Sequence, residues 1–162
     1  MSPDIRVGQG FDVHRAGDDV ARPMVLGGCR FPGVAGLVGH SDGDAVAHAV
    51  AEALLGAAGL GDIGQHFPDT DVRYLEADSI ELLRQVAAEV TAAGWSIGNA
   101  DCSVICERPR LAPMRDEMQR RLSEAVGAPV SVKGRRPEGL GALGRDEGIA
   151  VFAVAVLVRD RP

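Results

Sequence analysis

The sequence predicts an α/β (α+β) fold, with a single mixed β-sheet and helices packed on one side. Segments typical of strands and helices follow one another along 162 residues in the order β-β-α-α-β-α-β-β, which favours one sheet covered by helices. Hydrophobic residues make up 46% of the chain and aromatic residues 4%, so the expected core consists of Ala, Val, Leu and Ile. The length suits one domain, residues 1–162, with no repeat or linker.

The first half of the chain contains two predicted strands and one predicted helix. Residues 5–14 and 22–32 are rich in strand formers and bounded by Gly and Pro. Residues 41–61 are rich in helix formers, begin with the capping candidates Ser41 and Asp42, and end at a glycine. Residues 62–78 contain a proline and lack periodicity, so we expect a loop there.

The second half alternates between predicted helices and strands. Helical spacing predicts helices over residues 79–93 and 112–127. Alternation predicts strands at 99–109 and 129–133. The last segment, 148–159, is β-branched and almost wholly apolar, which predicts a strand buried on both faces.

Charge and composition exclude several classes of function. The net charge is −6, which argues against broad nucleic-acid binding but allows a local phosphate pocket. No apolar run reaches the roughly 18 residues that cross a bilayer, and the N-terminus lacks a signal-peptide core, so we expect a cytoplasmic protein without membrane partners. Cys29, Cys102 and Cys106 form no C-x-x-C pair and are expected to be reduced core residues.

Asp12, His14 and His48 are candidate metal ligands. Asp12 and His14 lie two residues apart on a predicted strand, so their side chains point the same way. His48 lies in an apolar helix, where a histidine is more often a hydrogen-bonded core residue than a ligand. Together the three supply a carboxylate and two imidazoles, and they leave a fourth tetrahedral position open. Such a set suits zinc, with manganese, cobalt or ferrous iron as substitutes.

A second candidate site is a glycine-rich basic segment. Arginines and backbone amides at such a turn suit phosphate oxygens, although a solvated basic loop is an equal alternative. Its cations are Lys133, Arg135, Arg136 and Arg145. Glu138 within it is either an ion-pair partner or a ligand for a phosphate-bound magnesium. The acidic loop with Asp62, Asp69 and Asp71 either binds hydroxyl groups or simply stabilises turns.

Five motifs in order along the chain carry a family resemblance. They are "GFDVH", "GHSDGDAVAHA", "LLGAAGLGDIG", "FPDTD" and a terminal pattern in which "GR" precedes "EGIA". With these motifs the chain resembles the 2-C-methyl-D-erythritol 2,4-cyclodiphosphate synthase family of the non-mevalonate isoprenoid pathway. The resemblance implies a homotrimer whose active sites lie between neighbouring subunits.

The resemblance also implies roles for individual residues. It implies zinc, or another divalent transition metal, on Asp12, His14 and His48, and magnesium or manganese between two substrate phosphates at Glu138. A mobile loop beside the substrate's phosphate would contain His40 and Ser41. The ribose and methylerythritol contacts would be Asp62, Ile63, Gly64, Phe67 and Asp69. Cytosine would be read at Cys106, Arg110, Leu111 and Ala112, and the basic segment adds Lys133, Arg136 and Arg145 for phosphate.

The implied reaction is an intramolecular phosphoryl transfer. The 2-phosphate of 4-diphosphocytidyl-2-C-methyl-D-erythritol 2-phosphate attacks the β-phosphorus, which gives the cyclic diphosphate and releases CMP. This chain departs from the family where "KGRRPEGLG" replaces a threonine-rich turn, because Arg136 and Pro137 replace two threonines. Pro137 has no amide hydrogen to donate. The alternatives are a non-catalytic protein that binds metal and a cytidine nucleotide, and a metal-dependent phosphoester hydrolase.

Overall fold

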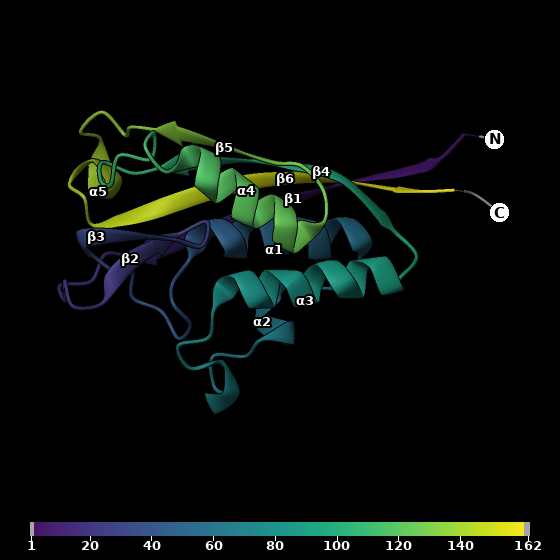
Figure 1. Ribbon diagram of the computed structural model, residues 1–162, viewed down its shortest axis with the longest axis horizontal. Helices are drawn as coiled ribbons and strands as arrows, with labels where there is room; N and C mark the ends of the chain where they lie inside the picture. The colour runs from purple at the N-terminus through teal and green to yellow at the C-terminus, as the bar shows by residue number, and fades with distance from the viewer. Residues whose placement is uncertain (1, 161–162) are drawn as a thin grey trace.

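A four-stranded mixed sheet forms one layer of the molecule (Figure 1). The computed structural model describes residues 2–160. The strand order is β1-β6-β4-β5. The strands are β1 (Asp4–Arg15), β4 (Ser96–Ile105), β5 (Val130–Arg135) and β6 (Gly148–Arg159). Strands β4 and β5 run parallel, and β6 is antiparallel to both β1 and β4, so the predicted mixed sheet is confirmed.

Two further strands form a separate hairpin, which corrects the prediction of a single sheet. Strand β2 (Pro23–Leu26) pairs with β3 (Cys29–Ala35), where one strand over 22–32 was predicted. Gly27 and Gly28, with φ of 57° and 73°, turn the chain between them. Two consecutive residues with positive φ are typical of a tight hairpin turn. The apolar residues on both sides of this turn therefore belong to two strands.

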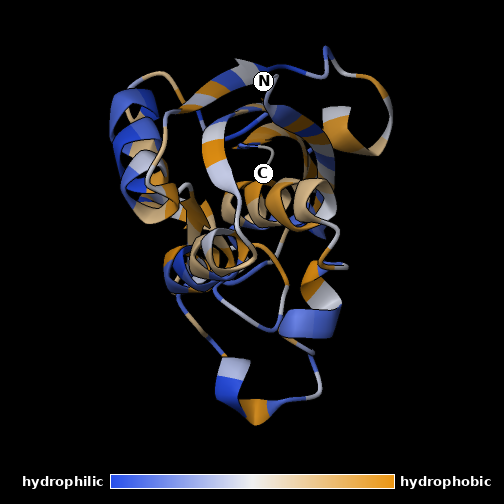
Figure 2. Ribbon diagram, turned by 90° about the vertical axis from the view of Figure 1, so that its right-hand side faces the viewer, coloured by the Kyte–Doolittle hydropathy of each residue, from blue (hydrophilic) through white to orange (hydrophobic). Residues whose placement is uncertain are grey.

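Three long helices pack on one side of the main sheet. They are α1 (Ala45–Ala58), α3 (Ser79–Ala92) and α4 (Arg115–Val126). Helix α1 lies directly against β1 and β6 and carries mostly hydrophobic residues, with α3 on its other side (Figures 1 and 2). All three predicted helices are present, but α1 is capped by Asp44 and not by Ser41 or Asp42.

Short helical turns lie in segments that were predicted to be loops. They are α2 (Ile63–His66), a 3₁₀ turn (Val72–Tyr74) and α5 (Gly141–Gly144). Their length of three or four residues gives no periodic signal that a sequence could show. The segment with α2 and the 3₁₀ turn projects away from the sheet (Figures 1 and 2). Of the helices between residues 2 and 160, none has the length and apolar character to cross a membrane.

The outer face of the sheet is not covered by helices. From Val151 onward, buried residues of β6 alternate with exposed or half-buried ones, so the prediction of burial on both faces is wrong within this chain. Phe152 and Val154 of β6 are 46% and 44% exposed. Phe11 of β1 lies directly opposite Phe152 in the ladder and is also 46% exposed. The strand is apolar on both faces, but only one face packs against the chain's own core.

Two glycines of β1 allow α1 to approach the sheet closely. A Cβ atom added at Gly8 would lie 2.0 Å from the carbonyl oxygen of Ala53, and one at Gly10 would lie 2.0 Å from that of Ala49. Both contacts are with helix backbone, which cannot rotate aside as a side chain can. Any side chain at these positions therefore has to move the helix away from the strand.

We expect Gly10→Ala to lower the free energy of unfolding by about 1–3 kcal/mol, as other overpacked core substitutions do. Urea unfolding followed by circular dichroism measures this difference. Gly56→Ala is the matched control, because Gly56 is on the exposed side of α1 and an added Cβ would lie an ordinary 3.9 Å from the oxygen of Gln9. That control should gain about 0.5–1 kcal/mol from helix propensity. Equal stability of Gly10→Ala and the parent would contradict the packing argument.

Candidate functional site

Asp12, His14 and His48 meet where β1 ends beside α1. Strand alternation points Asp12 and His14 to the side that α1 covers, and His48 points back from the second turn of that helix. The Nδ1 atom of His14 lies 2.7 Å from Oδ2 of Asp12, and Nδ1 of His48 lies 3.7 Å from the same oxygen. Ligand atoms of the three residues all lie within 4.8 Å of one another. The structure thus brings the predicted metal ligands together.

The geometry of these atoms fits a cation. Oδ2 of Asp12 and Nδ1 of His14 are both buried, and neither has a hydrogen-bond partner despite their short separation. Buried polar atoms without partners are rare in folded proteins because each costs free energy. A cation between them would satisfy both atoms. Two nitrogens and one carboxylate oxygen suit zinc or a similar divalent transition metal, and three ligands leave a tetrahedral position for substrate.

The three side chains also polarise one another. Burial raises the pKa of Asp12, but the neighbouring imidazoles of His14 and His48 lower it more, to about 2. Burial lowers the pKa of His48, and the Asp12 carboxylate outweighs this effect and raises it. Asp12 is therefore ionised at neutral pH and can attract either a proton or a metal ion to the adjacent imidazoles.

The loop before α1 places His40 and Ser41 beside this group. Ser41 is buried, and its Oγ lies 3.2 Å from Nε2 of His48. Nε2 of His40 lies 2.9 Å from the carbonyl oxygen of Asp71, which links the loop to the projecting segment. Arg22 donates from Nη2 to the carbonyl oxygen of Ser41 at 2.5 Å. The loop is therefore held from both sides.

Helix α1 also positions the projecting segment. Glu52, one turn after His48, accepts a hydrogen bond from the backbone N–H of Ile63 at 2.9 Å. Asp62 caps α2, and Phe67, half-buried at its end, packs edge-on against Tyr74. The backbone of the segment is thereby fixed from the same helix that carries His48. Gly64 and Asp69, two further predicted contact residues, are exposed on it.

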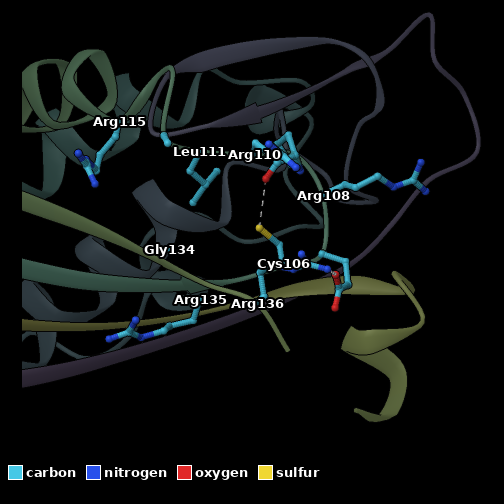
Figure 3. A pocket seen from close by; sticks show the side chains of 11 residues that line it. Cys106, Arg108, Arg110, Leu111, Arg115, Gly134, Arg135 and Arg136 are labelled. Carbon is cyan, nitrogen blue, oxygen red and sulfur yellow. Dashed lines mark hydrogen bonds and ion pairs between the residues drawn. The ribbon is translucent and has the colours of Figure 1, made fainter. Parts of the chain in front are cut away.

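A second group of predicted residues lines a pocket of about 570 Å³ beside β4 and β5 (Figure 3). The predicted members are Cys106, Arg110, Leu111, Ala112, Arg135 and Arg136. Figure 3 shows the side chains of Cys106 and Leu111 near the middle of the pocket and arginines extending around it. Sγ of Cys106 donates to the carbonyl oxygen of Pro109 at 3.6 Å, and burial raises the pKa of this thiol to about 11.

The turn after β5 is tied to this pocket by Glu107. Its carboxylate pairs with Arg136 at 2.8 Å and accepts the backbone N–H of Gly139 at 3.2 Å. Glu138 lies between these two contacts, exposed and with a φ of 55°. Arg136 is thus paired with a carboxylate of the pocket. Sequence reasoning placed Arg136 near phosphate but gave no sign of this ion pair.

Lys133 and Arg145, two more predicted phosphate contacts, lie elsewhere. Lys133 forms an ion pair with Asp101 across β4 and β5, and Arg145 pairs with Glu147 at 2.6 Å. Arg145 follows α5 at the start of the turn into β6. The structure therefore does not bring these two cations into the pocket with Arg136.

The metal-ligand group and the pocket lie at opposite edges of the sheet. The first is on β1 and the second adjoins β4 and β5, with β6 between them. Neighbouring strands are spaced by about 4.8 Å, so β1 and β5 are separated by roughly 15 Å. Within one chain, the two groups therefore form two separate candidate sites.

Sequence reasoning missed several residues that support these groups. They are Arg22, Asp42, Glu52, Ser79 and Glu107, whose contacts join segments far apart in the sequence. Asp42 was considered only as a helix cap, and Ser79 only as the start of a helix. Asp and Ser are common near the starts of helices in general, so finding Asp42 and Ser79 there gave no signal that they contact a site.

Comparison with known proteins gives consistent results. The model of the YgbB family matches residues 5–158. A 2-C-methyl-D-erythritol 2,4-cyclodiphosphate synthase from Rubrobacter xylanophilus is 53% identical over 95% of each chain. A bifunctional enzyme IspD/IspF from an Anaeromyxobacter species is 51% identical over 99% of this chain, which spans 42% of that relative's length.

Solved structures agree with the sequence relatives. The bifunctional IspDF from Campylobacter jejuni is 40% identical, with a TM-score of 0.92 over 98% of this chain and 43% of its own. IspF of Plasmodium falciparum in complex with CDP is 31% identical, with a TM-score of 0.84 over 99% of this chain and 100% of its own. With the family model matching nearly the whole length, the chain belongs to the YgbB family, and the family resemblance seen in its motifs is confirmed.

Proposed function

We propose that the chain is a phosphorus–oxygen lyase that converts 4-diphosphocytidyl-2-C-methyl-D-erythritol 2-phosphate to 2-C-methyl-D-erythritol 2,4-cyclodiphosphate and CMP. The three-ligand group of Asp12, His14 and His48 carries this proposal, because a metal held there keeps a position for a phosphate oxygen. The name of the R. xylanophilus relative and the CDP complex of the P. falciparum relative support it. We place the reaction in the cytoplasm, as expected from the sequence, and a water-soluble nucleotide conjugate as substrate is consistent with that location.

Two cations have candidate ligands in this chain. Asp12, His14 and His48 would hold zinc or another divalent transition metal, and Glu138 would hold magnesium or manganese with the substrate's diphosphate. Bound cations of this kind neutralise phosphate charge and polarise phosphorus–oxygen bonds. The unpartnered atoms of Asp12 and His14 support the first assignment. The exposure of Glu138 beside the pocket supports the second.

The protein's own residues would mainly bind and align the substrate. Cytosine would occupy the pocket, and a nearby arginine would meet the nucleotide phosphates. The contacts proposed there are Cys106, Arg110, Leu111, Ala112 and Arg136, with Lys133 and Arg145 as phosphate contacts that require rearrangement of their ion pairs. The loop would place His40 and Ser41 beside phosphate, and the projecting segment would contact ribose and methylerythritol through Asp62, Ile63, Gly64, Phe67 and Asp69.

The bond changes need little chemistry from side chains. An oxygen of the 2-phosphate forms a bond to the β-phosphorus while the bond from that phosphorus to the CMP oxygen breaks, and the electron pair leaves with CMP. A phosphate is already anionic near neutral pH, so no general base is needed. Such a transfer depends mainly on holding the two reacting phosphates of one substrate molecule together and on neutralising their charge.

A homotrimer would join the two parts of the site. Phe11 and Phe152 are in contact on the open sheet face, with ring centroids 4.9 Å apart. Further exposed apolar residues on the same face of β1 and β6 are Ile5, Val7, Val13 and Val154. Contiguous apolar surface of this kind marks an interaction site. Copies packed through this face would cover it and could bring one copy's pocket to another copy's metal ligands. The number three follows from the family resemblance.

The reaction itself is tested by phosphorus NMR on the purified protein with the diphosphocytidyl substrate, zinc and magnesium. We expect two coupled cyclic-diphosphate signals to appear together with CMP. Prior treatment with a chelator should abolish turnover, and adding both metals back should restore it. Linear phosphate products would indicate a hydrolase instead. Unchanged substrate, from folded protein that binds metal and CDP, would indicate the non-catalytic binding protein.

The assembly is tested with Phe152→Glu, which places a charge on the open face. We expect the trimer to dissociate into monomers and activity to fall at least about 100-fold, because burying an unpaired charge costs several kcal/mol. Sedimentation velocity gives the oligomeric state, and circular dichroism checks that the monomer is folded. Val20→Glu is the matched control, since Val20 is 64% exposed on the loop between β1 and β2. A monomeric parent protein with full activity would refute this assembly.

A further inference from the structure

Ser79 contacts His48 of the candidate metal site, although Ser79 is not itself a candidate metal ligand. It is the first residue of α3 and is only 1% exposed. Its Oγ lies 2.8 Å from Nε2 of His48, the nitrogen on the opposite side of the ring from Asp12. The same Oγ donates to Oδ1 of Asp42 at 2.5 Å. Asp42, Ser79 and His48 therefore form one continuous chain of hydrogen bonds.

Counting hydrogens along this chain determines how the imidazole is protonated. An ionised carboxylate has no hydrogen to give, so the bond between Ser79 and Asp42 uses the one hydrogen of the serine hydroxyl. Ser79 can then only accept from His48, which must carry its hydrogen on Nε2. The neutral ring consequently has its lone pair on Nδ1, the nitrogen that faces Asp12 at 3.7 Å. This is the form that a metal ion requires.

We propose that Ser79, held by Asp42, is a positioning residue that fixes the tautomer and orientation of His48 for metal binding. The inference rests on the proposed metal site, because it assigns Nδ1 of His48 as the ligand atom. Partners of this kind behind a metal-bound histidine typically change metal affinity 10–100-fold. Ser79 thereby connects α3 to the metal site through a side chain that touches neither metal nor substrate.

The nearby hydroxyl of Ser41 is less suited to this role. Its Oγ is 3.2 Å from Nε2 of His48 and 3.3 Å from Oγ of Ser79, so both contacts are longer. Ser41 is on the loop that also carries the proposed phosphate contact His40, whereas Ser79 is fixed at the start of a helix. The shorter bond and the fixed position identify Ser79 as the partner of His48.

The hydroxyl of Ser79 can be removed without removing the backbone hydrogen bonds at the start of α3. The backbone N–H of Ser79 donates separately to Oδ2 of Asp42 at 3.2 Å. Asp78, and not Ser79, caps α3 through the N–H of Ile80 at 2.9 Å. Both bonds persist in Ser79→Ala. A change in metal affinity in that variant would therefore report the hydroxyl and not the start of the helix.

The test is a zinc titration of the metal-free protein against a competing chelator. We expect Ser79→Ala to raise the zinc dissociation constant by about 10–100-fold. Ser123→Ala is the matched control, because the hydroxyl of Ser123 accepts a hydrogen bond from the N–H of Val130 on the other side of the molecule. Its zinc affinity should equal that of the parent. A dissociation constant for Ser79→Ala within about threefold of the parent would overturn the proposal.

A double-mutant cycle tests whether Asp42 acts through Ser79. In Asp42→Ala, the hydroxyl hydrogen of Ser79 is free to bond Nε2 of His48, so the ring is no longer held in the tautomer that binds metal. This substitution should therefore weaken zinc binding in the parent but cause little further weakening in the Ser79→Ala background. Equal weakening in both backgrounds would contradict the hydrogen-bond chain. Nitrogen-15 NMR of the metal-free parent, at a pH where the ring is neutral, should show the hydrogen of His48 on Nε2. A hydrogen on Nδ1 would overturn the tautomer assignment.

These outcomes separate this inference from the proposed function. Zinc binding is measured without substrate, so a catalytically inactive protein can still confirm or refute the role of Ser79. A parent protein that binds no zinc would refute the metal site itself and the positioning role with it. A parent that binds zinc tightly, with Ser79→Ala unchanged, would refute only the positioning role.

Discussion

The close approach of helix α1 to strand β1 is the constraint on which the candidate site depends. Gly8 and Gly10 let the helix backbone lie where a β-carbon would otherwise be, and Asp12 and His14 follow on the same side of the strand. His48 on the helix consequently lies within reach of both. The ligand atoms are held by secondary structure at both ends, so the strength of the packing, and not a flexible loop, determines the geometry of the site.

Asp44 and Asp12, both next to α1, show that the same type of side chain can serve either the fold or a candidate site. Asp44 is fully buried, and its carboxylate accepts four backbone N–H groups, two from the hairpin turn and two from the helix. Burial and the neighbouring Asp42 raise the pKa of Asp44, and these amides partly offset the rise. Asp12, by contrast, keeps a buried oxygen without a hydrogen-bond partner. The first carboxylate has completed its contacts within the fold, whereas the second still lacks one.

Local signals in the sequence predicted those parts of the structure that local interactions determine. Helix periodicity predicted α3 correctly, and the motif with Asp12 and His14 predicted two candidate ligands on one face because strand alternation is itself local. The hairpin at Gly27 was missed, since an apolar run shows strand propensity but not which strands pair. The role of Ser79 could not be predicted, because its partner Asp42 is 37 residues away. Long-range contacts decided these features, and only the folded chain shows them.

The face of β6 that was wrongly predicted to be buried within the chain is the face through which the proposed trimer would assemble. The sequence shows that the strand is apolar on both faces, but not whether the second cover comes from the same chain or from another copy. Within the chain, Phe152 and Val154 are left open, while the candidate metal ligands and the pocket beside β4 and β5 lie at opposite edges of that sheet. In the proposed trimer, a single interface would cover the apolar face and join the two parts of the site. Stability and activity would then depend on the same contacts, so selection for catalysis would also maintain an apolar surface that a monomer could not keep exposed without risk of aggregation.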